Sequence, residues 1–233
     1  MDGSEKVRII SRFLIKHVGH SGSLKHIEKY DSKGDIGKEA TTDTIQRNKI
    51  SYHWQRLSFI YTWQASKQPQ LVCFLPANTL DEFQEWWANE NIDMATSPPL
   101  VLLTKALEYV VLNFDYAVWS WRNIVRRLEE RRREVDDLQK EWVVNMHEIA
   151  RHAIHSSEML EMALHVVDSL LAEVERASGS HNPTVPSPPK NTNQTLNIIR
   201  RQKTMLQCIH LRSQALEKRI QNEMALVGSH LNQ

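Results

Sequence analysis

The longest stretch of the chain without glycine or proline runs from Leu100 to Ser178. These two residues disfavour a helix interior more than any others, so a stretch of this length predicts helix throughout. A single straight helix over it would measure about 115 Å at roughly 1.5 Å per residue, which is too long for a compact domain. We therefore predict two antiparallel helices over 98–178, with the break in the charged run "EERRREVDD".

Apolar residues recur every three or four positions along both predicted helices, which is the spacing of an amphipathic helix. The first series is Leu103, Leu107, Val110, Phe114, Val118, Trp121, Val125 and Leu128. The second series is Val135, Leu138, Trp142, Met146, Ile149, Ala153, Leu160, Leu164, Val167, Leu171 and Val174. We expect each series to face a shared core.

A proline-rich loop over 179–193 separates these helices from a last helix over 194–233. The apolar stripe of that helix is Leu196, Ile199, Leu206, Ile209, Leu216, Ile220, Val227 and Leu231, with Ser213 as a polar member. A stripe of this kind suits a helix that packs along its length against a partner, as in a coiled coil.

The N-terminal part of the chain has a different pattern. Residues 1–50 are polar and partly disordered in this interpretation, apart from a strand at "VRIISRFLI". Residues 51–97 form a small α/β unit, in which "SFIYTWQ" and "QLVCFL" predict strands and "NTLDEFQEWWANE" predicts a helix with Thr79 as N-cap and Glu82 completing a capping box. The predicted fold class is α+β, a small N-terminal α/β unit followed by a bundle of three long helices.

Composition and motifs reduce the number of functional classes that fit this sequence. A net charge of +1 argues against a nucleic-acid binder, and two cysteines far apart fit a reducing, cytoplasmic compartment. The most apolar window, "PLVLLTKALEYVVLNF", is interrupted by Lys105 and Glu108, so we expect no direct membrane span. The common phosphate-binding and hydrolase motifs are missing, so we predict no enzyme activity.

The most chemically suggestive stretch is "HEIARHAIHSSEMLE". Glu148, His152, His155 and Glu158 stand at i, i+4, i+7 and i+10, near one helix face, and are the candidate metal ligands. A metal-dependent enzyme is one hypothesis for this face. The alternative is a hydrogen-bonded polar stripe that packs helix against helix.

Three segments resemble a known family. "RHAIHSSEML" (Arg151–Leu160) is similar to an RH-x-IH-x-SE-x-L stretch of fungal CorA-like divalent-cation transporters. "LRSQALEKRIQNEMALV" (Leu211–Val227) resembles their LRS-x-AL-x-x-R-x-x-NE-x-x-L segment, and "VWSWRNIVRRLE" (Val118–Glu129) resembles the preceding VW-x-x-R-x-x-VR-x-x-E helix. The resemblance covers roughly 98–230 and is in the family's order.

The resemblance implies an α/β layer and long cytosolic helices, the last of which leads toward a pore. It implies Mg²⁺ or another divalent cation as the ion, and a homo-oligomer or full-length CorA-like subunits as partners. The sequence contains no Gly-Met-Asn and no spanning segment, so we expect a cytosolic domain truncated before the pore and not itself transport-competent. A helical protein-interaction module unrelated to transport stays open as the alternative.

Overall fold

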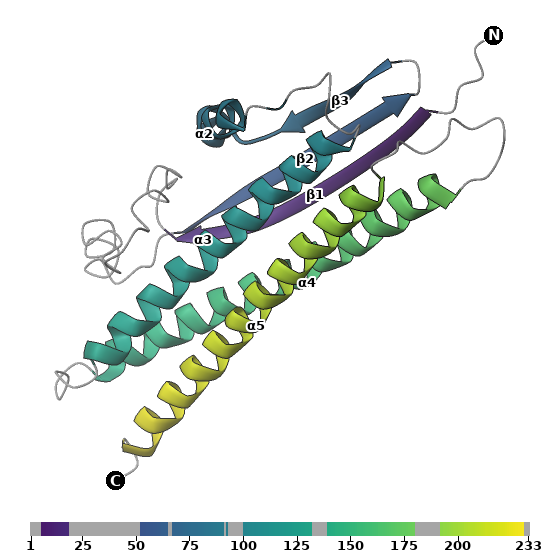
Figure 1. The fold of residues 1–233 in the computed structure, drawn as a ribbon. Helices are drawn as coiled ribbons and strands as arrows, with labels where there is room; N and C mark the ends of the chain where they lie inside the picture. The colour runs from purple at the N-terminus through teal and green to yellow at the C-terminus, as the bar shows by residue number, and fades with distance from the viewer. Residues whose placement is uncertain are drawn as a thin grey trace. The chain divides into compact units, whose positions relative to one another are not determined.

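The computed structural model describes residues 6–18, 52–64, 67–90, 92, 100–131, 139–179 and 192–230. Over these ranges the chain is α+β, and strands precede the helices (Figure 1). The strands are β1 (Lys6–Val18), β2 (Tyr52–Gln64) and β3 (Lys67–Phe74). The helices are α2 (Ala77–Asn89), α3 (Val101–Arg131), α4 (Gln139–Gly179) and α5 (Thr192–His230). The predicted fold class is confirmed, including the three long helices.

The strands form one sheet in the order β1-β2-β3. β2 and β3 are antiparallel, with Ile60 opposite Val72 and Ser58 opposite Phe74, and the register becomes irregular between Thr62 and Gln64. β3 contains Pro69, which has no amide hydrogen to donate. An edge strand tolerates proline because the backbone amides on its outer side have no ladder partner. The sheet takes its first strand from the N-terminal segment, ahead of the residues over which the sequence predicts an α/β unit.

The structure describes two helices over the stretch without glycine or proline, α3 ending at Arg131 and α4 beginning at Gln139, and most of the charged run predicted to hold the break lies outside the described residues. The apolar stripes are buried as expected wherever their side chains are described, except that Leu164 is half-buried. Ser213, the polar member, is also buried. The stripe residues whose side chains lie outside the described set are Leu128, Val135, Leu138, Trp142, Val227 and Leu231.

The prediction that Thr79 caps α2 is wrong. The N-cap is Pro76, and no side chain makes a cap hydrogen bond. Thr79 lies inside the first turn, where its Oγ1 donates to the carbonyl oxygen of Pro76 at 2.9 Å. The chain enters the helix directly after the proline, so Thr79 already has helical backbone angles and its hydroxyl points back along the helix instead of accepting from a free amide.

The chain forms two compact units, and α3, α4 and α5 each contribute a segment to both. Unit 1 consists of Met1–Leu14, Arg56–Asn113 and Glu161–Gln207. Unit 2 consists of Ile15–Gln55, Phe114–Leu160 and Cys208–Gln233. Each has its own buried apolar residues.

In unit 1, aromatic rings attach α2 to the sheet and to α3. Phe83 of α2 lies 6.4 Å from the ring of Phe59 on β2 and meets Tyr109 of α3 edge-on, with centroids 4.9 Å apart. All three side chains are buried. Contacts of this geometry add directional attraction to the area that they remove from water.

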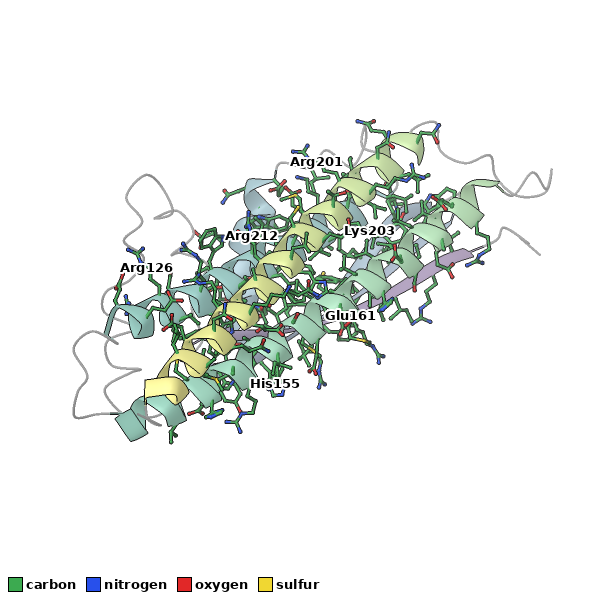
Figure 2. The ribbon with its side chains drawn as sticks, turned by 90° about the horizontal axis from the view of Figure 1, so that it is seen from below. Arg126, His155, Glu161, Arg201, Lys203 and Arg212 are labelled. Carbon is green, nitrogen blue, oxygen red and sulfur yellow. The ribbon has the colours of Figure 1, made fainter. Side chains whose placement is uncertain are left out.

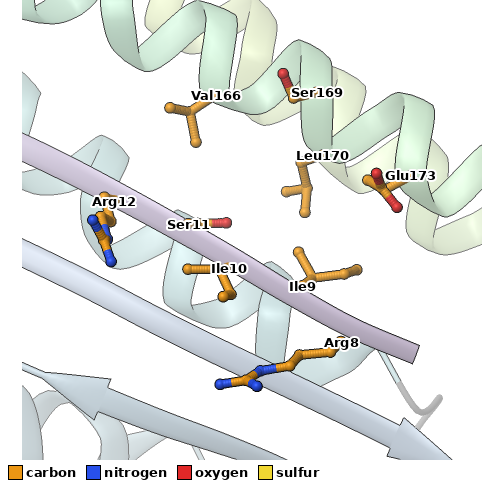
Figure 3. Close-up of a pocket in the computed structure, with 9 residues that line it drawn as sticks. All are labelled: Arg8, Ile9, Ile10, Ser11, Arg12, Val166, Ser169, Leu170 and Glu173. Atoms are coloured by element: carbon orange, nitrogen blue, oxygen red, sulfur yellow. The ribbon is translucent and has the colours of Figure 1, made fainter. Parts of the chain in front are cut away.

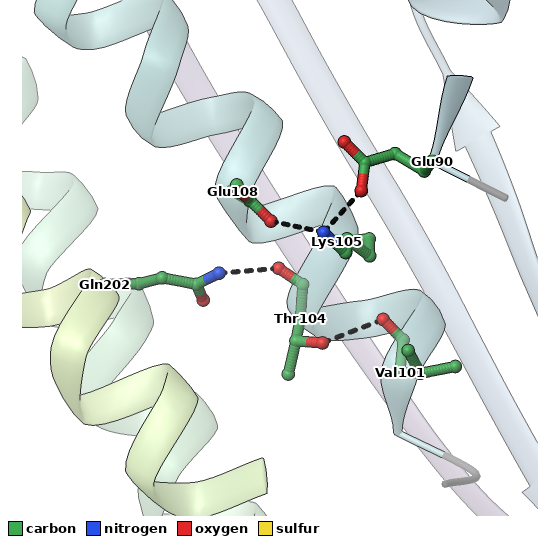
Figure 4. A network of polar contacts seen from close by, with 6 residues as sticks. All are labelled: Glu90, Val101, Thr104, Lys105, Glu108 and Gln202. Carbon is green, nitrogen blue, oxygen red and sulfur yellow. Dashed lines mark hydrogen bonds and ion pairs between the residues drawn. The ribbon is translucent and has the colours of Figure 1, made fainter. Parts of the chain in front are cut away.

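Polar contacts in unit 1 join helices that are distant in sequence (Figure 4). Lys105 of α3 forms ion pairs with Glu90 and with Glu108, the latter at 2.9 Å. Gln202 Nε2 of α5 donates to the carbonyl oxygen of Thr104 at 2.8 Å, and both residues are buried. A buried amide needs such a partner, so this bond fixes the register of α5 against α3.

In unit 2, α3, α4 and α5 share one apolar core. Its buried members are Trp121, Ile124 and Val125 of α3, Met146, Ile149 and Ala153 of α4, and Leu216 and Ile220 of α5. Val18 of β1 and Met224 of α5 pack against this core and are partly buried. Burial of such side chains removes apolar surface from water, which is the main driving force for packing these helices together.

Candidate functional site

The four candidate metal ligands all lie on α4 in unit 2, but their side chains have different surroundings. His152 is buried, Glu148 and His155 are half-buried, and Glu158 is exposed. His152 Nε2 lies 3.8 Å from Glu148 Oε1, which is beyond hydrogen-bond distance. Among the described residues, no group of three or more His, Cys, Asp or Glu side chains is placed to hold a metal ion.

A buried lysine meets this face of α4 from the sheet. Lys16 of β1 is 3% exposed, and its Nζ lies 3.0 Å from Nδ1 of His155 (labelled in Figure 2). The same Nζ lies 4.2 Å from the ring centroid of Tyr52 and 4.8 Å from that of Trp54, both on β2. Lys16 is therefore held by two aromatic faces and one imidazole, a cation–π arrangement joined to a hydrogen bond.

The surroundings of Lys16 disfavour its charged form and lower its pKa. Burial and the neighbouring Arg151 guanidinium lower the pKa of Lys16 from 10.5 to about 8, although Glu148 acts in the opposite direction. Burial and the Lys16 charge likewise lower the pKa of His155. A neutral His155 ring with its proton on Nε2 accepts from the Lys16 ammonium at Nδ1, and this tautomer follows from the short contact.

His152 lies between two aromatic side chains. It stacks on Trp121 of α3 with ring centroids 4.8 Å apart and an angle of 21°, and its other neighbour is Tyr52, at 4.6 Å. Neither ring nitrogen has a hydrogen-bond partner among the described residues. Burial, followed by the charges of Lys16 and Arg151, lowers the pKa of His152 to about 4. The ring is thus neutral at physiological pH.

Strand and helix are tied together around the same point. Trp121 Nε1 donates to the backbone carbonyl oxygen of Lys16 at 3.1 Å. The next residue of β1, His17, shares a 2.8 Å hydrogen bond with Gln55 of β2 and stacks on His53. Burial lowers the pKa of His17 to about 4. We call Lys16, Tyr52, Trp54, His152 and His155 the lysine–histidine cluster.

The cluster does not suit Mg²⁺. That ion prefers oxygen ligands, usually carboxylates and water, in a near-octahedral set. Here the Lys16 ammonium lies against the His155 nitrogen that a metal would use, and Arg151 adds a second positive charge nearby. The arrangement can hold a proton between amine and imidazole and clamp β1 and β2 to α4, but it offers no cation cage.

The resemblance segments also meet in unit 2. Glu129 of α3 and Arg219 of α5 form a bidentate ion pair, with Nε–Oε1 at 3.2 Å and Nη2–Oε2 at 2.5 Å. Arg212 Nη1 of α5 donates to Asp115 Oδ1 of α3 at 3.0 Å. Its guanidinium carbon lies 5.5 Å from the ring of Trp119. Two such pairs, both advancing along α3 and α5, show that these helices run in the same direction in unit 2.

Sequence reasoning missed the strand half of the cluster. Tyr52 and Trp54 stand two apart on β2, so alternation along a strand places both on one face. Lys16 interrupts the apolar run "RFLIKHV". A lone lysine in such a run, together with a pair of aromatic residues two positions apart, was the available signal, but nothing in the sequence pairs Lys16 with a histidine 139 positions later.

Comparison with protein-family models, curated proteins and solved structures finds no match. Within the described part of the chain, none of the helices combines the length and the apolarity that crossing a membrane requires.

Proposed function

We propose that the chain is the cytosolic domain of a CorA-like divalent-cation transporter, with a regulatory or subunit-association role. Ion conduction in this proposal belongs to membrane-embedded parts of the transporter, because a selective pore must be lined through the bilayer. Mg²⁺ or another divalent cation is the transported ion and has no assigned ligands in this chain. The cytosolic face of a membrane is the corresponding location.

The observation that carries the proposal is the Glu129–Arg219 ion pair. Both residues stand at named positions of the resemblance patterns, one in the α3 segment and one in the α5 segment, 90 positions apart. The third segment, in α4, contributes His152 and His155 to the same unit. Chance similarity in separate segments gives no reason for pattern residues of two of them to form an ion pair, whereas descent from one folded unit does.

α5 also offers a surface for association. Leu211 is 64% exposed on this helix, and Ala215, one turn later, is exposed as well. A large apolar side chain next to a small one allows a second helix to approach closely. Subunit contact along α5 would cover this site without disturbing the buried stripe on the other side of the helix.

Sedimentation velocity over a range of protein concentrations, with and without magnesium, tests the proposal. We expect reversible self-association, and mixed complexes with the isolated cytosolic domain of a CorA-like transporter. Leu211→Glu should weaken both. Met162→Glu is the matched control, because Met162 is a 58% exposed apolar residue on a different helix, α4.

A chain that stays monomeric with and without magnesium, and that does not bind the CorA-like domain, would contradict the proposal. Self-association without any affinity for the CorA-like domain would favour the alternative, a helical interaction module unrelated to transport. Equal weakening by Leu211→Glu and Met162→Glu would place the contact elsewhere than on α5.

A further inference from the structure

A hollow of about 490 Å³ lies between β1 and α4 in unit 1 (Figure 3). Arg8, Ile9, Ile10, Ser11 and Arg12 of β1 line it on one side. Val166, Ser169, Leu170 and Glu173 of α4 line the other. Its volume is within the range of ligand pockets. We call it the β1 groove.

The groove follows the edge of a strand. Successive residues of a strand point to opposite faces, so a hollow lined by five consecutive residues runs beside the strand and not over one face of it. β1 stands at the end of the sheet order and pairs with β2 alone among the described strands. Its other edge therefore has no ladder partner among the described strands, and the groove follows residues 8–12 of that edge.

The charge of the groove is positive. Arg8 and Arg12 are exposed, lie on the same face of β1, and form no ion pair with another described residue. Ile10 stands between them and is 53% exposed. Glu173, the acidic residue on the α4 side, is already paired with Arg176. This face of β1 thus presents a cation, an apolar residue and a second cation, at every second position of the strand.

We propose that the β1 groove binds an extended peptide in which acidic and apolar residues alternate, by adding it as a fourth strand to the edge of β1. Backbone hydrogen bonds supply affinity. Because side chains alternate between the two faces of a strand, the acidic residues of such a peptide lie on the face of Arg8 and Arg12, and its apolar residues lie on the opposite face, that of Ile9. A second copy of β1 fits poorly. Antiparallel pairing centred on Ile10 would set Arg8 opposite Arg12. In-register parallel pairing would set each arginine opposite its own copy. Both arrangements place like charges across the strand pair, which destabilises it.

Fluorescence anisotropy with a labelled peptide of alternating glutamate and valine tests this inference on the full chain. We expect saturable binding that weakens with added salt. The double variant Arg8→Glu, Arg12→Glu should weaken binding at least about tenfold, since it replaces two attractions with two repulsions. Arg201→Glu, at an exposed position of α5 outside the groove (Figure 2), is the matched control and should bind like wild type.

A second peptide separates strand addition from simple anion binding. It has the same sequence, with the backbone nitrogens that face β1 methylated, so it keeps the charge and loses the hydrogen bonds. Loss of binding supports the inference. Equal binding of both peptides, no binding of either, or equal effects of the groove and control variants would overturn it. Thermal melts of each variant, monitored by circular dichroism, confirm that a loss of binding is not a loss of fold.

Discussion

Replacing His152 with phenylalanine keeps an aromatic ring between Trp121 and Tyr52 but removes the group that acid must protonate. His152 is 1% exposed, and its two ring nitrogens have no hydrogen-bond partner among the described residues. A phenylalanine at this position leaves no polar atom unsatisfied and retains most of the stacking area. We therefore expect the variant to be at least as stable as wild type at pH 7.5.

The magnitude of the acid effect follows from linkage. Burial lowers the pKa of His152 from 6.5 to about 4 in the folded chain, so the unfolded chain binds a proton first as the pH falls. The free energy of unfolding then decreases as the pH falls from 6.5 toward 4, and the loss is complete near the lower value. A pKa difference of about 2.5, at about 1.4 kcal/mol per unit, gives a loss of roughly 3 to 4 kcal/mol.

Urea unfolding at pH 7.5, 6.5, 5.5 and 4.5, followed by tryptophan fluorescence, measures this loss. The acid loss of His152→Phe should be smaller than that of wild type, and the gap between the two should grow with each step down from pH 6.5. His147→Phe is the control on the same helix, because His147 is exposed. If His152→Phe and wild type lose stability in parallel, the buried neutral imidazole is not the origin of acid sensitivity.

Two further predictions concern unit 2. Ile220 is fully buried in the core of α3, α4 and α5, so Ile220→Asp should lower the free energy of unfolding by about 3 kcal/mol or more, whereas Ile220→Val should cost about 1 kcal/mol; similar melting of the two variants would contradict the packing. In a double-mutant cycle, Glu129→Gln and Arg219→Met should show a coupling free energy of about 1 kcal/mol that decreases with salt, because the pair is bidentate but partly exposed; coupling of zero at low salt would argue against the pair.

The long helices were predictable because their signal is local and repeated. Each apolar residue of the stripe reports the same face, and a stretch without glycine or proline leaves few alternatives to helix. The division into two helices, α3 and α4, was also predictable, although nothing in the charged run forces a turn. A helix of that length simply cannot stay within a compact domain. The start of α2 was predicted wrongly, because cap chemistry at Thr79 competes with the start that Pro76 imposes.

The lysine–histidine cluster could not be predicted from sequence pattern alone. A strand is recognised by alternation, and β1 and β2 were only partly recognised because Lys16, Tyr52 and Trp54 add polar or amphipathic side chains to the pattern. The contacts that these three side chains make depend on which helix packs on that side of the strand. His152 and His155 were singled out for chemistry from their spacing, but the neighbours that set their pKa values come from other elements of unit 2.

The two proposals draw on different residues, and this makes their tests separable. Glu129 and Arg219, the pattern residues in contact, lie in unit 2 with the third resemblance segment, whereas the β1 groove is lined by residues of unit 1 alone. Charge reversal at Arg8 and Arg12 should therefore leave self-association unchanged, and Leu211→Glu should leave peptide affinity unchanged. If one variant abolished both activities, the peptide and the second subunit would be using the same surface, and the inference of a separate strand-binding edge would fail.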